Sequence, residues 1–187
     1  MTDRAGPRPW TRLAIAGSGA HVAIELGAGV GLPLASVVGP LPAAAGWAAA
    51  TAAGWRAAGQ GGSRRDTVLR VVDGTALAAV AAHWLGWPRR RRGLPWLTRC
   101  EGLEGGVMVP YNAVLAVTAV GAVAGLVREN RSAGRAAGLA PLALVPVLVR
   151  VQHREHAALV AAAHAHPAWW NRRLARSGDG PLSARGR

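Results

Sequence analysis

Residues 13–38 read LAIAGSGAHVAIELGAGVGLPLASVV, an apolar stretch that is interrupted in its middle by His21 and Glu25. A helix needs about 20 apolar residues to cross a bilayer, so the stretch is long enough to span a membrane. His21 and Glu25 are four positions apart and share one face of a helix. Ionisable side chains are costly at membrane depth and mark functional sites where they are tolerated. The stretch therefore predicts a membrane helix that carries a buried polar site.

Apolar segments at 43–58, 67–87, 105–127 and 136–151 follow, separated by clusters of arginine. Glycine and proline break the first, fourth and fifth of the five segments. The pattern predicts an all-α fold, a polytopic integral membrane helix bundle of four or five transmembrane helices with Pro/Gly-broken segments. We expect four parts: a basic N-terminal arm at 1–12, the transmembrane bundle at 13–151, an amphipathic interfacial C-terminal helix at 152–176 and a disordered tail at 177–187.

The net charge of +13 rests on 22 basic residues, all of them arginine. These arginines flank the apolar segments, which favours contact with anionic lipid headgroups over a nucleic-acid surface. Membrane lipids are therefore the predicted partners, and we expect no nucleic acid. The arginine and alanine bias is typical of a GC-rich genome, and we expect a multi-pass protein of the bacterial cytoplasmic (inner) membrane.

The number of spans depends on segment 67–87. Five spans with the N-terminus inside would leave slightly more arginines outside than inside, against the positive-inside rule. A re-entrant segment 67–87 would instead place most arginines inside. The hydropathy of the segment favours a full crossing, so we favour five hydrophobic helices and leave the orientation open.

Three residues form the candidate catalytic group. A carboxylate beside an imidazole orients the ring and raises its basicity, so His21 and Glu25 could move a proton on a lipid-soluble substrate. Asp73 would join them if segments 13–38 and 67–87 are neighbours, although pairing with Arg70 at i, i+3 is the better expectation for it. A purely structural hydrogen bond between spans is the alternative for His21 and Glu25.

Ligand-binding candidates cluster at the start of segment 105–127. They are Glu101, Tyr111 and Asn112, of which Asn112 lies deepest and most needs a partner. A single cysteine, Cys100, excludes an intrachain disulfide and a CxxC site. The tail histidines do not have the i, i+4 spacing of a zinc helix, so we predict no metal ligands and no cofactor. Those histidines are His153, His156, His164 and His166.

The stretch His21-Val22-Ala23-Ile24-Glu25 resembles the His/Glu pair of the emopamil-binding (EXPERA) family of membrane isomerases and sterol binders. The resemblance implies a cavity in which a double bond shifts by protonation and deprotonation, with Asp73 and Asn112 in the family's further acid and asparagine roles. The chain departs from the family in that segment 43–58 has no acid, aromatic residues are few and a fifth segment follows. The resemblance covers a handful of positions, and we do not assign the chain to the family.

Function is predicted most simply as binding of a lipid-soluble, hydrophobic small molecule at the His21–Glu25 site. The alternatives are a non-catalytic accessory protein that assembles with a membrane protein partner or as a homo-oligomer, an EXPERA-like acid–base isomerase, and a small proton-coupled transporter. Convergence of the polar groups on a cavity would favour binding or chemistry. One-to-one pairing of those groups without a cavity would favour the accessory protein.

Overall fold

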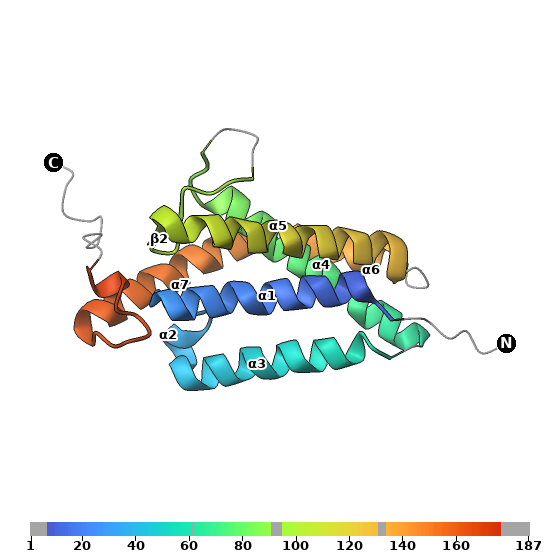
Figure 1. Ribbon diagram of the computed structural model, residues 1–187, viewed down its shortest axis with the longest axis horizontal. Coiled ribbons are helices and arrows are strands. Elements are labelled where there is room, and N and C mark those ends of the chain that lie inside the picture. Colours follow the sequence, from blue (N-terminus) through green and yellow to red (C-terminus); the bar gives the residue numbers. More distant parts are fainter. Residues whose placement is uncertain (1–6, 61, 91–94, 131–133, 177–187) are drawn as a thin grey trace.

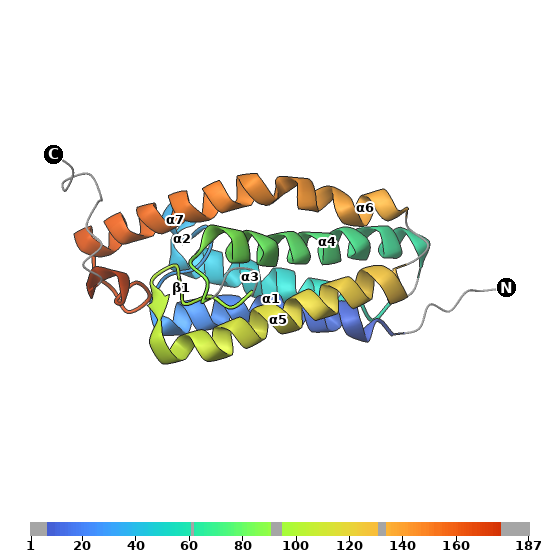
Figure 2. The same cartoon turned by 90° about the horizontal axis from the view of Figure 1, so that it is seen from above.

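The computed structural model is mostly helical, which confirms the all-α prediction. It describes residues 7–60, 62–90, 95–130 and 134–176. Figures 1 and 2 show the long helices lying side by side along one axis. The elements, in chain order, are α1 (Pro9–Ala28), α2 (Ala35–Val38), α3 (Pro40–Ala57), α4 (Ser63–Gly86), β1 (Arg99–Cys100), β2 (Leu103–Glu104), the 3₁₀ turn η1 (Gly105–Val107), α5 (Met108–Ala124), the π-turn η2 (Gly125–Glu129), α6 (Arg135–Leu139), the 3₁₀ turn η3 (Ala140–Leu144), α7 (Val145–Ala165) and the 3₁₀ turn η4 (Leu174–Arg176).

Helix α1 begins four residues before the expected start of the apolar segment. Proline is tolerated at the first helical position because the N–H it lacks would have no partner there, and Pro9 occupies that position. The carboxylate of Glu129 accepts hydrogen bonds from the backbone N–H groups of Trp10 (2.8 Å) and Thr11 (2.9 Å). A negative charge at this end also complements the helix dipole. Gly29, with φ +76°, ends the helix in the left-handed conformation.

Small residues allow α1 and α5 to approach closely. Gly121 of α5 lies so near α1 that a Cβ there would stand 2.6 Å from the backbone nitrogen of Ala14 and 2.9 Å from the carbonyl oxygen of Trp10. A Cβ on Gly17 of α1 would likewise stand 3.2 Å from the Cα of Thr118 on α5 and closer still to its hydroxyl group. Close backbone contact through small residues is the usual packing mode of membrane helices. It fixes α1 against α5 along their length, which positions the functional site described below.

Three helices are long and apolar enough to cross a membrane among the described residues: Arg64–Gly86, Gly105–Glu129 and Ala136–Ala165. The first of these is one continuous helix, α4, so segment 67–87 is helical as far as Gly86. The boundary expected between residues 151 and 152 falls inside α7, which runs through it without a break. The predicted tail at 177–187 and residues 1–6 of the predicted arm lie outside the described residues.

Large apolar side chains cover the outer surfaces of these helices. A soluble protein rarely exposes so many in contiguous stripes, whereas lipid tails would cover them in a bilayer. They include Val109, Val117, Val120, Val123 and Val127 on the Gly105–Glu129 helix, Val68, Val71 and Leu85 on α4, and Leu139, Leu144, Val147 and Val151 on the Ala136–Ala165 segment.

Candidate functional site

The pair predicted from the sequence lies inside the bundle. His21 and Glu25 share one face of α1, and His21 Nε2 stands 3.0 Å from Glu25 Oε1. Glu25 is only 1% exposed. The ring of His21 also hydrogen-bonds the backbone carbonyl of Ser18, one turn earlier. The α1 helix therefore presents an imidazole and a carboxylate that are held together and face its neighbours.

A second imidazole comes from α4. The ring of His83 meets the ring of His21 edge to face, with centroids 4.9 Å apart. His83 is 4% exposed, and its Nδ1 lies 2.8 Å from the carbonyl oxygen of Ala79. Gln152 of α7 approaches the same ring, with its side-chain amide 2.9 Å from Nδ1. Contacts with the backbone and with α7 therefore fix the plane of the His83 ring.

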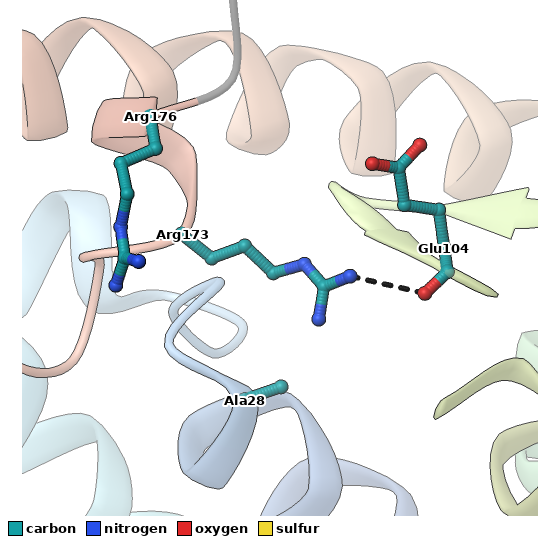
Figure 3. Close-up of a pocket in the computed structure, with 4 residues that line it drawn as sticks. All are labelled: Ala28, Glu104, Arg173 and Arg176. Carbon is teal, nitrogen blue, oxygen red and sulfur yellow. Dashed lines mark hydrogen bonds between the residues drawn. The ribbon is translucent and has the colours of Figure 1, made fainter. Parts of the chain in front are cut away.

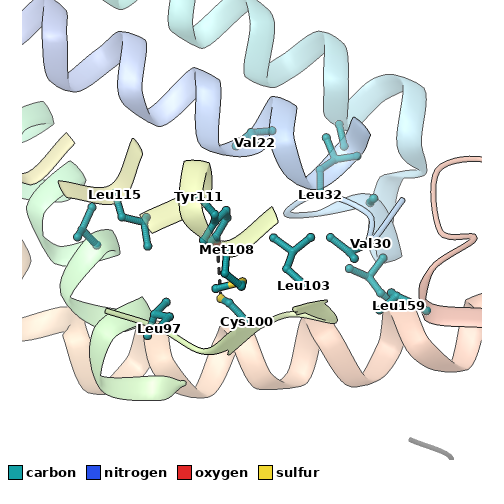
Figure 4. Packing of buried hydrophobic residues seen from close by; sticks show 14 of the residues in the cluster. Val22, Val30, Leu32, Leu97, Cys100, Leu103, Met108, Tyr111, Leu115 and Leu159 are labelled. Atoms are coloured by element: carbon teal, nitrogen blue, oxygen red, sulfur yellow. Dashed lines mark hydrogen bonds between the residues drawn. The ribbon is translucent and has the colours of Figure 1, made fainter. Parts of the chain in front are cut away.

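The short β1–β2 hairpin brings Glu101 and Cys100 against these rings. Glu101 sits at the tip with φ +49°, and Gly102 follows with φ +84°. Two successive residues in the left-handed region make the chain turn back between two-residue strands. The carboxyl group of Glu101 thereby reaches the carboxyl group of Glu25, to which it is hydrogen-bonded. Figure 4 shows Cys100 directed toward α5.

Tyr111 of α5 completes the group. Its hydroxyl donates to Glu25 Oε1 at 2.8 Å and lies 3.5 Å from Cys100 Sγ, the contact drawn in Figure 4. Its ring also packs edge to face on His21 at 5.6 Å. We call the five side chains that meet here the polar cluster: His21, Glu25, His83, Glu101 and Tyr111.

Burial dominates the electrostatics of the hairpin residues. It raises the pKa of Glu101 to about 8, and the nearby charge of Glu25 adds to the effect. Burial likewise raises the pKa of the Cys100 thiol well above its usual range. Two carboxyl groups in contact resist ionising together in a site of low polarity, because their like charges repel and neither is well solvated. The polar cluster can therefore donate or accept a proton at a buried position.

A pocket of about 310 Å³ lies between the end of α1, the hairpin and η4. Figure 3 shows its walls, which are Ala28, Glu104, Arg173 and Arg176. Ala28 lies three residues after Glu25 on α1, and Glu104 lies three residues after Glu101, so α1 and the hairpin contribute both to the pocket and to the cluster, although no cluster residue lines the pocket. Arg173 donates to the carbonyl oxygen of Glu104 at 3.0 Å. The guanidinium groups make this pocket a favourable place for an anionic or strongly polar group.

Asn112 lies one residue from Tyr111 but has a different environment. Its side chain accepts from the backbone N–H of Leu97 at 2.8 Å and donates to the Leu97 carbonyl at 3.0 Å. It also donates to the Met108 carbonyl at 2.6 Å. These bonds fasten the chain before β1 to α5. The structure therefore gives Asn112 backbone partners, and its predicted ligand contact stays a prediction.

Asp73 is placed with a different set of side chains. Its Oδ2 accepts from Thr11 Oγ1 at 3.0 Å and from Asn130 Nδ2 at 2.7 Å, at the start of α1 and the end of η2. Arg70 donates to the backbone carbonyl of Asn130, so its guanidinium is engaged beside Asp73. We call Thr11, Asp73 and Asn130 the Asp73 network. It joins three elements and shares no hydrogen bond with the polar cluster among the described residues.

The structure brings together four of the six predicted site residues, namely His21, Glu25, Glu101 and Tyr111. It adds His83 and Cys100, which sequence reasoning did not include. From the sequence alone, the position of His83 beside Trp84 and Trp87 at the end of segment 67–87 predicts a residue at the membrane interface. His83 is only 4% exposed because it lies on a helix that packs against α1. The sequence does not reveal this, because it does not give the orientation of α4.

No protein-family model, curated protein or solved structure matches the chain, so the functional argument rests on the geometry of the site. The resemblance to the EXPERA family stays confined to the His21–Glu25 stretch.

Proposed function

We propose that the protein is a multi-pass protein of the bacterial cytoplasmic membrane whose polar cluster binds a lipid-soluble small molecule. The three apolar helices and their exposed valine and leucine side chains support membrane residence. Helices α1 and α3, with 20 and 18 residues, lie alongside them and are long enough to complete a bundle of four or five spans. Polar side chains as enclosed as Glu25 are expensive in such a bundle and are typically kept for function.

One observation carries the ligand proposal. Five polar side chains from three helices and a hairpin converge at one buried place, and the same α1 helix and hairpin also supply Ala28 and Glu104 to a pocket that holds two arginines. A binding site for a mostly apolar molecule needs a few convergent polar groups of this kind. We infer that the ligand has an apolar body and a polar or anionic end, which the Arg173 and Arg176 side chains would hold near Glu25. The Asp73 network, with its carboxylate shared between two donors, has the character of a structural connection.

The number of spans is testable with single cysteines. Gln60 follows α3 and Thr98 precedes β1, both are exposed, and α4 lies between them. If α4 crosses the membrane, an impermeant thiol reagent will label only one of the Gln60→Cys and Thr98→Cys variants in intact cells, and both after permeabilisation. The wild-type chain is the control, because Cys100 is buried and should stay unlabelled. Labelling of both variants from outside, or of neither, would show that α4 does not cross.

The ligand proposal predicts that lipophilic compounds co-purify with the protein in mild detergent. We expect the extract of the wild-type protein, analysed by mass spectrometry, to contain a compound that is about tenfold depleted in Glu25→Gln. Gln keeps the size of the side chain and its capacity to accept from Tyr111, so the fold should persist. The control is Asp73→Asn, which alters a buried carboxylate outside the polar cluster. Identical extracts from wild type and Glu25→Gln would contradict the proposal and favour the accessory alternative.

A further inference from the structure

Four side chains of the polar cluster have the donor atoms of a transition-metal site. One ligand atom each from His21, Glu25 and His83 lie within 4.8 Å of one another, and His83 stands within the same limit of Glu101. Glu101 also contacts the carboxyl group of Glu25 and acts electrostatically on both imidazoles. Donors on a tetrahedral zinc ion, bound at about 2.0–2.2 Å, are roughly 3.5 Å apart. Side-chain rotations that shorten these separations by about 1 Å would be enough to enclose an ion.

Charge balance favours a dication at this place. The chain contains no lysine, and no arginine is among the groups that act on Glu25 or Glu101 in the described residues. Apart from the carboxyl group of Glu101, no N–H or O–H group of the described residues reaches Glu25 Oε2. Two ionised carboxylates would therefore be uncompensated. A divalent cation with two carboxylates and two neutral imidazoles gives a neutral unit, which is the least costly form inside an apolar bundle.

The imidazoles are held as metal-binding histidines usually are. A ligating histidine typically donates its second ring N–H to a carbonyl or carboxylate, which fixes the tautomer and aims the other nitrogen at the metal. His83 Nδ1 meets the Ala79 carbonyl at 2.8 Å, and the His21 ring bonds the Ser18 carbonyl. His21 Nε2 faces Glu25 without an aligned hydrogen bond among the described residues. Tyr111 supplies a further support by donating to Glu25.

The geometry points to a divalent first-row transition-metal site formed by His21, Glu25, His83 and Glu101. The nitrogen and oxygen donors suit zinc, iron or manganese, and zinc is the probe because it accepts four ligands without a redox change. The inference goes beyond ligand binding and does not depend on it, because metal content is measured with no lipophilic ligand added.

The test is metal analysis of the full chain, purified in mild detergent with an affinity tag free of histidine. After dialysis against zinc and then against buffer, we expect about one zinc per wild-type chain, and at least a fivefold lower content in His83→Gln and Glu101→Gln. His153→Gln and Glu104→Gln are matched controls. His153 lies on α7 and packs on Trp87, and Glu104 has an exposed side chain on the same hairpin as Glu101. Both controls should keep the wild-type stoichiometry.

The unfolding temperature is a second readout of zinc binding, and it can be used even if a variant folds poorly. Binding to the native state alone raises the unfolding temperature, so a chelator should lower the wild-type midpoint, zinc should restore it, and Glu101→Gln should show neither change. Glu101 is at a hairpin tip, where the substitution disturbs little packing. A wild-type zinc content below about a tenth of an equivalent would overturn the inference, as would equal content in wild type and both cluster variants.

Discussion

Replacing Gly121 with valine should cost the largest part of the stability of this protein. Even a single Cβ at Gly121 would stand 2.6 Å from the backbone nitrogen of Ala14, and a backbone atom cannot move aside as a side-chain end can. Overpacking of a well-packed contact typically costs about 1–3 kcal/mol, and a β-branched residue against a helix backbone should lie at or above the upper end. Thermal unfolding in detergent, followed by tryptophan fluorescence, measures the loss.

Gly46→Val is the matched control for that substitution. Gly46 lies inside α3, and a Cβ at this position meets nothing within 4 Å. Valine there changes the intrinsic helix propensity alone, by a few tenths of a kcal/mol. An equal loss at both positions would mean that α1 and α5 do not depend on close contact at Gly121.

Removing the carboxylate of Asp73 should cause the second largest loss of stability. Asp73→Ala removes the acceptor that Thr11 Oγ1 and Asn130 Nδ2 share in a buried place. Thr11 can still donate to Glu129, and Asn130 can still donate to Thr11, so we expect a total loss of about 1–3 kcal/mol. The network joins the start of α1 to α4 and to the end of η2. Loosening it should therefore lower the free energy of unfolding of the whole bundle.

Asp73→Asn separates hydrogen bonding from charge. The amide oxygen can accept from both Thr11 and Asn130, so most of the stability should return. Thermal unfolding of the two variants beside the wild type gives the comparison. A loss in Asp73→Asn as large as in Asp73→Ala would show that the negative charge matters more than the hydrogen bonds.

The helices were predictable because composition alone marks them. Long apolar segments between arginine clusters gave their positions, and the spacing of His21 and Glu25 placed both on one helix face. Helix α1 begins at Pro9, inside the basic arm predicted at 1–12, because proline fits the first helical position. Long-range capping by Glu129 has no local sequence signal, since its partners lie 118 and 119 residues away.

The membership of the polar cluster was only partly predictable. Which face of α4 meets α1 cannot be derived from periodicity, because alanine and valine surround the helix on all sides. His83 was therefore assigned to the membrane interface. Glu101 was left open, and its route to Glu25 depends on a two-residue turn with two positive φ angles that the sequence signals only through Gly102. Asn112 needed a partner as predicted, but that partner is the backbone of Leu97.

The contact between α1 and α5 also sets the order of events during biogenesis. Glu25 and its hydroxyl donor Tyr111 are separated by 86 residues. At ribosomal rates of about 5–20 residues per second, Tyr111 is synthesised roughly 4 to 17 s after Glu25. During most of that interval the carboxyl group of Glu25 has only His21, on its own helix, as a partner, until His83 and then Glu101 follow. Until the second half of the chain arrives, α1 therefore depends on its early neighbours α3 and α4 for tertiary contacts.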